Sequence, residues 1–109
     1  MRGAKDTIPS KEDPRIVYEV GCSDCPKVYI GETGRTVKKR IGEHRGHLRC
    51  GTHNLSAVAT HALEEGHNIF WEPRIISREK ETTRRKIKEA MMIAKIPESR
   101  SMNQDRGPK

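Results

Sequence analysis

Residues 15–33, RIVYEVGCSDCPKVYIGET, decide the fold that the sequence predicts. Residues 15–20 and 27–33 are rich in β-branched and aromatic side chains, which favour strands. Residues 21–26 between them supply turn-forming residues, so we expect a β-hairpin with a long loop. The fourteen residues before the hairpin hold two prolines and six charges without apolar periodicity. We therefore expect residues 1–14 to be a flexible lead-in.

Two helices are predicted after the hairpin. The first begins at Thr36, an N-cap candidate, and fades near residues 50–51. The second lies between Asn54 as its cap and Gly66 as its stop signal. Their apolar faces are formed by Val37, Ile41 and Leu48 in the first helix and by Leu55, Val58, Ala59, Ala62 and Leu63 in the second.

A third strand and a third helix complete the pattern. Residues 69–77, IFWEPRIIS, predict a strand in which Pro73 indicates a sheet edge or a bulge. Residues 79–95 predict a helix that ends before Pro97, and residues 97–109 are expected to be irregular. The apolar positions of this helix are Ile87, Ala90, Met91 and Ala94. The order β-β-α-α-β-α indicates an α+β fold with a short antiparallel or mixed three-stranded sheet and about three flanking helices.

Composition limits the classes of function. The 109 residues are enough for one domain, and with 32% hydrophobic against 34% charged residues its core must be thin. The net charge of +7 suits a polyanionic partner such as nucleic acid. No apolar run approaches the roughly 20 residues of a membrane span, and residues 1–14 lack the apolar stretch of a signal peptide. We expect an intracellular protein that does not bind membranes.

The cysteines indicate a metal site. Cys22 and Cys25 stand in a C-x₂-C arrangement in the hairpin loop, which is half of a zinc site. The other half could come from either of two pairs, which spacing alone does not separate. These pairs are His61 with His67 and Cys50 with His53. A further alternative is that the thiols are merely reduced and bind no metal.

Four residues could form a catalytic site. Tyr18 and Tyr29 lie on the two arms of the hairpin, where cross-strand pairing can bring them onto one face. Taken alone, two such tyrosines are most often core aromatics. Arg40 and His44 follow at i and i+4 on the next helix, so they share one side of it. The combination makes a functional site the better interpretation.

The ordered motifs resemble a known family. V-Y at residues 17–18, Y-I-G at residues 29–31 and R-x-x-x-H at residues 40–44 are similar to the GIY-YIG endonucleases. The stretches CSDCPKVYIGETGR, KKRIGEH, SAVATHALEEGH and KEAMMI are most similar to the endonuclease domain of Penelope-like retroelements. The resemblance covers residues 15–105, which leaves residues 106–109 as a tail. The sequence departs from the family where Arg15, Ile16 and Val17 precede Tyr18 and a motif glycine is expected, and residues 102–105 only approximate the family's late motif.

The resemblance implies a DNA endonuclease with a small GIY-YIG fold that uses one Mg²⁺ or Mn²⁺ ion. It also implies a nuclear location, no small-molecule substrate, and a reverse transcriptase of the same element as a partner. The implied catalytic residues are Tyr18, Tyr29, Arg40, His44, Glu89 and Asn103, with Glu89 as the magnesium ligand. The implied structural Zn²⁺ ligands, which would staple the thin-cored domain, are Cys22, Cys25, His61 and His67.

These residue types suit phosphodiester hydrolysis. The reaction needs a base for the attacking water and a cation against the charge that develops around phosphorus. Arg40 can contact a phosphate and favour the phenolate form of a neighbouring tyrosine. One carboxylate suffices for Mg²⁺, which keeps several waters and takes a further ligand from the substrate. We expect phosphate contacts from Arg35, Lys38, Lys39, Arg45 and Arg49 near the first helix and from Arg84, Arg85, Lys86 and Lys88 on the last.

Two other classes of protein stay open at this point. One is a zinc-dependent nucleic-acid-binding module that keeps the fold but has lost cleavage, which the missing motif glycine favours. The other is a zinc-stapled protein-interaction domain. The tyrosine, arginine and glutamate set separates an enzyme from both, and salt-dependent DNA binding separates the first from the second.

Overall fold

The computed structural model describes residues 10, 12–51 and 56–103. Its elements are β1 (Pro14–Cys22), β2 (Val28–Thr36), α1 (Val37–Cys50), α2 (Ala57–Glu65), β3 (Ile69–Arg78), α3 (Thr82–Lys95) and the short 3₁₀ helix η3 (Glu98–Arg100). The predicted order and the α+β class are confirmed. Of the predicted lead-in and tail, residues 1–9, 11 and 106–109 lie outside the described residues, and Pro14 belongs to β1.

The sheet has the strand order β2-β1-β3 and is antiparallel throughout. In the predicted hairpin, Tyr18 of β1 lies opposite Gly31 of β2, and Val20 lies opposite Tyr29. β3 is an edge strand, and its pairing with β1 shifts register in the stretch that contains Pro73. Both readings of this proline, as a sheet edge and as an irregularity, are therefore correct.

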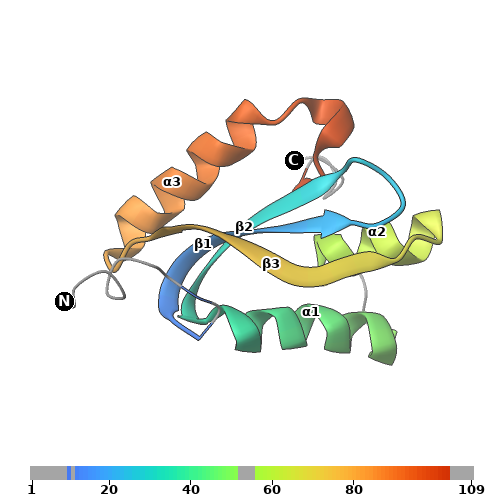
Figure 1. The fold of residues 1–109 in the computed structure, drawn as a ribbon, viewed down its shortest axis with the longest axis horizontal. Helices are drawn as coiled ribbons and strands as arrows, with labels where there is room; N and C mark the ends of the chain where they lie inside the picture. Colours follow the sequence, from blue (N-terminus) through green and yellow to red (C-terminus); the bar gives the residue numbers. More distant parts are fainter. Residues whose placement is uncertain (1–9, 11, 52–55, 104–109) are drawn as a thin grey trace.

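The sheet separates two layers of helices. α3 covers one face, and α1 and α2 lie on the other (Figure 1). Ile16, Tyr18 and Val20 alternate along β1 toward the α1 and α2 layer, where they form a cluster of buried side chains. The helices contribute Val37, Ile41, Val58 and Ala62 to this cluster. Among the described residues, no helix has the length and apolar character needed to cross a bilayer.

The caps of α1 match the prediction, and so does the C-cap of α2 at Gly66 (φ 67°), whereas the N-cap of α2 does not. Thr36 accepts a hydrogen bond from the backbone N–H three residues on at 3.2 Å, and α1 ends at Gly51 in the left-handed conformation (φ 80°). α2 is capped by Ser56, whose Oγ accepts from the N–H of Ala59 at 3.2 Å. The predicted cap Asn54, like Leu55 of the predicted apolar face, lies outside the described residues.

The orientation of α3 differs from the one that its apolar pattern suggests. Ile87 and Met91 are 53% and 56% exposed, and Ala90 and Ala94 are exposed as well. The residue of this helix that is buried is Arg85, at 5% exposure. The helical periodicity therefore predicts the helix but not the face that contacts the sheet.

An ion pair explains which face of α3 contacts the sheet. Arg85 Nε donates to Glu32 Oε1 of β2 at 2.7 Å, and Arg85 Nη1 donates to the carbonyl of Glu79 at 3.1 Å. Charge-assisted bonds of this kind are stronger than neutral ones, so they fix the face of the helix that meets the sheet. The helix also begins at Thr82 rather than at Glu79, because the Glu81 side chain accepts from the N–H of Arg84 and caps it.

The segment after α3 was expected to be irregular, but it packs onto β2. Ser101 forms a parallel bridge with Val28, and the N–H of Met102 donates to the Val28 carbonyl at 2.8 Å. Met102 is fully buried. The Asn103 amide pairs with the backbone of Ile30, accepting from its N–H and donating to its carbonyl, each at 2.9 Å. The described end of the chain thus adds hydrogen bonds along the β2 edge of the sheet.

We expect Arg85→Met to lower the free energy of unfolding by about 3 kcal/mol, because it removes one partner of a buried pair and leaves the other charge under-compensated. Lys86→Met is the matched control. Lys86 Nζ also lies 2.8 Å from Glu32 but is 62% exposed, so its loss should cost less than about 1 kcal/mol. Urea unfolding followed by circular dichroism measures both variants. Equal losses would show that the Arg85 pair does not hold α3.

Candidate active site and metal centre

Two tyrosines share one face of the β1–β2 hairpin. Tyr18 is fully buried and Tyr29 is 7% exposed, and their ring centroids are 6.3 Å apart at an angle of 49°. Their approach depends on Gly31, where a Cβ atom would lie 2.6 Å from Tyr18 Oη and 2.8 Å from Tyr29 Cε2. Real side chains do not come this close, so residue 31 must be glycine for the two rings to keep their places.

A buried chain of hydrogen bonds joins β1, α1 and α2. Tyr18 Oη lies 3.2 Å from Nε2 of His44, which is fully buried on α1. His44 Nδ1 lies 2.6 Å from Ser56 Oγ at the start of α2. The His44 ring also meets Tyr29 edge-on, with centroids 5.3 Å apart. Sequence reasoning missed Ser56, although its preference for N-cap positions was a usable signal.

Burial sets the charge state of Tyr18 and His44. It raises the pKa of the Tyr18 hydroxyl far above its usual range; Tyr29 and Glu89 raise this pKa further, whereas Arg40 lowers it. The charge of Arg40 acts in the direction that favours phenolate, as expected from the residue types, but desolvation of the phenol outweighs it. Burial, and next the charge of Arg40, lower the pKa of His44 to about 4. At neutral pH the pair is therefore an un-ionised phenol beside a neutral imidazole.

Arg40 stands next to this pair. It comes from α1, is 28% exposed, and lies close enough to Tyr18 for its charge to act on the phenol. Its Nη1 donates to Glu43 Oε1 at 2.9 Å, and Glu43 also pairs with Arg35 at 2.6 Å. Glu43 thus orients Arg40, and sequence reasoning missed it although the i, i+3 spacing could have shown the contact.

The last two predicted site residues come from the C-terminal half. Glu89 is half-buried on α3, and its negative charge raises the pKa of Tyr18, which places the carboxylate in the electrostatic field of the tyrosine site. Asn103 instead bonds the backbone of Ile30, the residue between Tyr29 and Gly31. The structure therefore brings five of the six predicted residues into one electrostatic group and ties the sixth to the strand that carries Tyr29.

The predicted phosphate contacts differ in how accessible they are. Arg35, Lys38, Lys39, Arg45 and Arg49 are exposed on and before α1. Arg85 was wrongly placed among the phosphate contacts, since it is buried against Glu32. Lys86 also bonds Glu32, and Lys88 lies 3.1 Å from Glu79. Of the four basic residues predicted on α3, the three that follow Arg84 therefore all lie in ion pairs.

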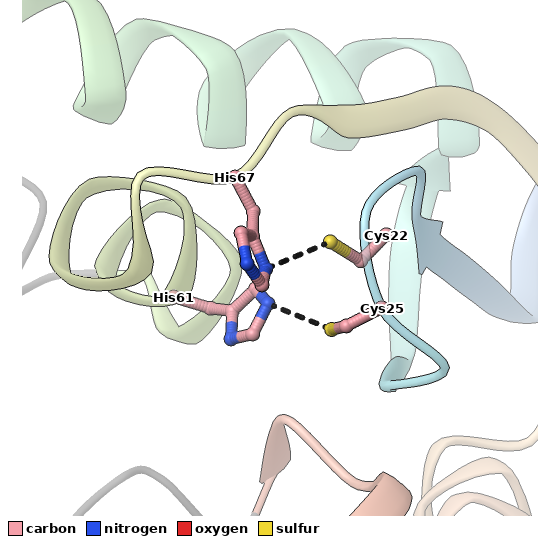
Figure 2. A group of neighbouring side chains, drawn as sticks. All are labelled: Cys22, Cys25, His61 and His67. Carbon is pink, nitrogen blue, oxygen red and sulfur yellow. Dashed lines mark hydrogen bonds between the residues drawn. The ribbon is translucent and has the colours of Figure 1, made fainter.

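Four side chains meet at the far end of the hairpin. Cys22 at the end of β1 and Cys25 in the hairpin loop face His61 of α2 and His67 beyond it (Figure 2). Cys22 Sγ lies 3.5 Å from His67 Nδ1, and Cys25 Sγ lies 3.4 Å from His61 Nε2. One ligand atom from each of the four residues fits within 4.8 Å of all the others. Cys50 is exposed and outside this group, and its predicted companion His53 lies outside the described residues.

The distances in this group fit a tetrahedral metal. Zinc bonds of about 2.3 Å to sulfur and about 2.0–2.1 Å to nitrogen, at tetrahedral angles, put sulfur and nitrogen roughly 3.6 Å apart. The observed contacts of 3.4 and 3.5 Å are close to this edge length. Two thiols and two imidazoles are also the donor set of structural zinc sites. The group could therefore hold a structural metal such as zinc between the hairpin loop and α2.

A family model of the GIY-YIG catalytic domain matches residues 14–95. The chain belongs to this family. The match covers the two tyrosines, Arg40, His44, Glu89 and the four residues of the metal group, and it supports a nuclease of the GIY-YIG type with DNA as substrate. No curated protein and no solved structure matches the chain.

This GIY-YIG domain has an isoleucine where the first motif glycine of the family is expected, and the core accommodates the isoleucine side chain. Ile16 stands two residues before Tyr18, on the same face of β1. It is fully buried in the cluster that contains Tyr18 and Val37. The added side chain is therefore absorbed by apolar packing, and the hydrogen bond between Tyr18 and His44 forms beside it.

The free energy of unfolding should depend on pH through His44. Its pKa is about 4 when folded and about 6.5 when unfolded, so between these values the unfolded chain binds more protons. Stability should thus be lost as the pH falls, by about 2 kcal/mol between about pH 7 and about pH 5. His44→Gln should lack this part of the loss while keeping the contributions of all other groups. Urea unfolding of both proteins at both pH values gives the difference, and parallel pH profiles would contradict the assignment.

We expect the four-residue group to bind about one Zn²⁺ per chain. Because this binding is coupled to folding, loss of the metal should also destabilise the fold. Cys22→Ser and His67→Ala should each lose the metal and the cooperative thermal transition. Cys50→Ser is the matched control and should keep both, since Cys50 is exposed and outside the group. Elemental analysis and thermal unfolding with and without a chelator measure these effects. A wild-type transition that a strong chelator leaves unchanged would contradict the metal site.

Proposed function

We propose that this GIY-YIG domain is a metal-dependent DNA endonuclease that hydrolyses phosphodiester bonds. The observation that carries the proposal is the buried Tyr18–His44 hydrogen bond beside the Arg40 guanidinium. The charge of Glu89 acts on the same phenol. A proton-transfer pair, a cation and a carboxylate are the groups that this hydrolysis requires.

Glu89 is the residue that would hold one Mg²⁺ or Mn²⁺ ion. A carboxylate oxygen is the ligand that such hard cations take, and a half-buried glutamate leaves room for the waters they keep. When bound, the ion would act as a Lewis acid toward the scissile phosphate.

Tyr18 and His44 would move the proton of the attacking water. Neutral His44 can accept at Nε2 when its Nδ1–H is donated to Ser56 Oγ, and the distances of 3.2 and 2.6 Å suit this tautomer. Tyr18 takes a proton from water while its own hydroxyl proton passes to His44 Nε2. A free phenolate, which burial disfavours, then does not have to build up. Arg40 stabilises the charge that develops on the phosphate oxygens.

The remaining proposed residues position the site and its substrate. Asn103 would act by holding the backbone of Ile30, and so the strand that carries Tyr29. Tyr29 packs edge-on against His44 and would keep that ring in place. The exposed DNA contacts that we propose are Arg35, Lys38, Lys39 and Arg45.

We place the enzyme with the Penelope-like retroelements. The supporting features are the sequence CSDCPKVYIGETGR at residues 22–35 and the cysteine and histidine group, which we propose binds zinc. A nuclear location and a reverse transcriptase partner belong to this part of the proposal. The alternative function is a zinc-stabilised DNA-binding module without cleavage, which the isoleucine at residue 16 favours.

The purified protein should nick supercoiled plasmid DNA when given Mg²⁺ or Mn²⁺. Arg40→Ala should slow nicking by about 100-fold or more, because it removes a charge that acts on the transition state. Arg74→Ala is the control. Arg74 also bonds a glutamate, Glu19 at 2.6 Å, but is 66% exposed on the edge strand, so nicking should be unchanged.

Two outcomes would overturn the catalytic assignment. If the Arg40→Ala variant nicks DNA at the normal rate, Arg40 has no role in the mechanism. DNA binding without nicking under every divalent metal tested would establish the binding-module alternative.

A further inference from the structure

A groove lies on the side of α1 that faces away from Arg40. The groove, of about 310 Å³, separates this helix from β3, and its lining includes Lys38, Gly42 and Arg45 from α1 and Trp71, Glu72 and Pro73 from β3. Arg40 and Arg45 are five residues apart, which sets them roughly 140° apart around the helix axis. The groove is therefore distinct from the tyrosine site, with α1 between them.

The lining of the groove combines a stacking surface with positive charge. The Arg45 guanidinium lies over the Trp71 ring, 5.5 Å from its centroid. Lys38 stands about two turns before Arg45 on the same side of α1 and is 69% exposed. Gly42 lies between them, and a Cβ atom there would meet nothing within 4 Å, so the helix presents an open wall. Glu72 is the carboxylate in the lining, and Lys38 also lies 3.8 Å from Glu12 in an exposed pair that holds it only weakly, so both cations can turn to a phosphate.

We propose that this groove binds an unpaired nucleotide of single-stranded DNA, with its base stacked on the Arg45–Trp71 pair and its phosphates against Lys38 and Arg45. The choice of DNA rests on the proposed function. Bases stack on tryptophan and on guanidinium planes irrespective of sequence, because every base has a π-face. A base inside a duplex has both faces covered by its neighbours, so only an unpaired base can enter. The substrate would then be DNA with an unpaired segment close to the cleavage site.

The chain offers a direct probe, because Trp71 is its single tryptophan. Without added Mg²⁺, a single-stranded oligonucleotide should quench the Trp71 emission saturably, and a duplex of the same sequence should quench it much less. In fluorescence anisotropy with a labelled single strand, Trp71→Leu should raise the Kd by about tenfold. Phe70→Leu is the matched control, since Phe70 is an exposed neighbour on the opposite face of β3, and it should leave the Kd unchanged.

The outcomes separate this inference from the proposed function. If the wild-type protein nicks plasmid DNA but single strands do not quench Trp71, nucleotide binding in the groove is contradicted and the nuclease function is supported. If Trp71→Leu weakens DNA binding while no metal supports nicking, nucleotide binding in the groove is supported and the nuclease function is contradicted. Equal quenching by duplex and single strand overturns the preference for unpaired bases. Should Trp71→Leu fail to fold, the wild-type quenching and Arg45→Gln, which should raise the Kd several-fold, decide the matter.

Discussion

The absence of a side chain at residue 31 is the constraint on which the site depends. Tyr18 of β1 lies across the backbone of Gly31 on β2, with its hydroxyl oxygen 2.6 Å from the place where a Cβ atom would stand. Only from this position can the phenol reach His44 on α1. The rest of the hydrogen-bond chain to Ser56 follows from that placement, and so does the electrostatic contact with Arg40.

Polar ties supplement a small apolar core. The buried cluster lies on the α1 and α2 side of the sheet, whereas α3 is fastened to the other side by the Arg85–Glu32 pair. The described end of the chain is fastened by the Asn103 amide, and the hairpin loop meets α2 through the cysteine and histidine group. Each of these contacts joins parts that are distant in sequence, and the Arg85–Glu32 pair draws on the charged residues that make up 34% of the chain.

Sequence reasoning succeeded where periodicity or chain order is decisive. The strands, the helices and the edge position of Pro73 follow from local patterns, and the ordered motifs bring together the tyrosines, Arg40 and His44. It failed for the buried face of α3, because apolar periodicity cannot show that an arginine will find a partner such as Glu32. It also missed the packing of Met102 and the contacts of Ser56, since both depend on which elements meet in space.

The position of the metal group relative to the tyrosines has a consequence for how the hairpin is aligned. Cys22 lies four residues after Tyr18, and Cys25 lies four residues before Tyr29. Slipping an antiparallel pair by one residue turns every side chain of the moved strand to the opposite face, which would point Tyr29 toward α3 and set Ile30 against His44. Only the native alignment lets both thiols reach the histidines while both phenols face α1. The cysteine and histidine group therefore constrains, from outside the tyrosine site, the register of the two strands that carry Tyr18 and Tyr29.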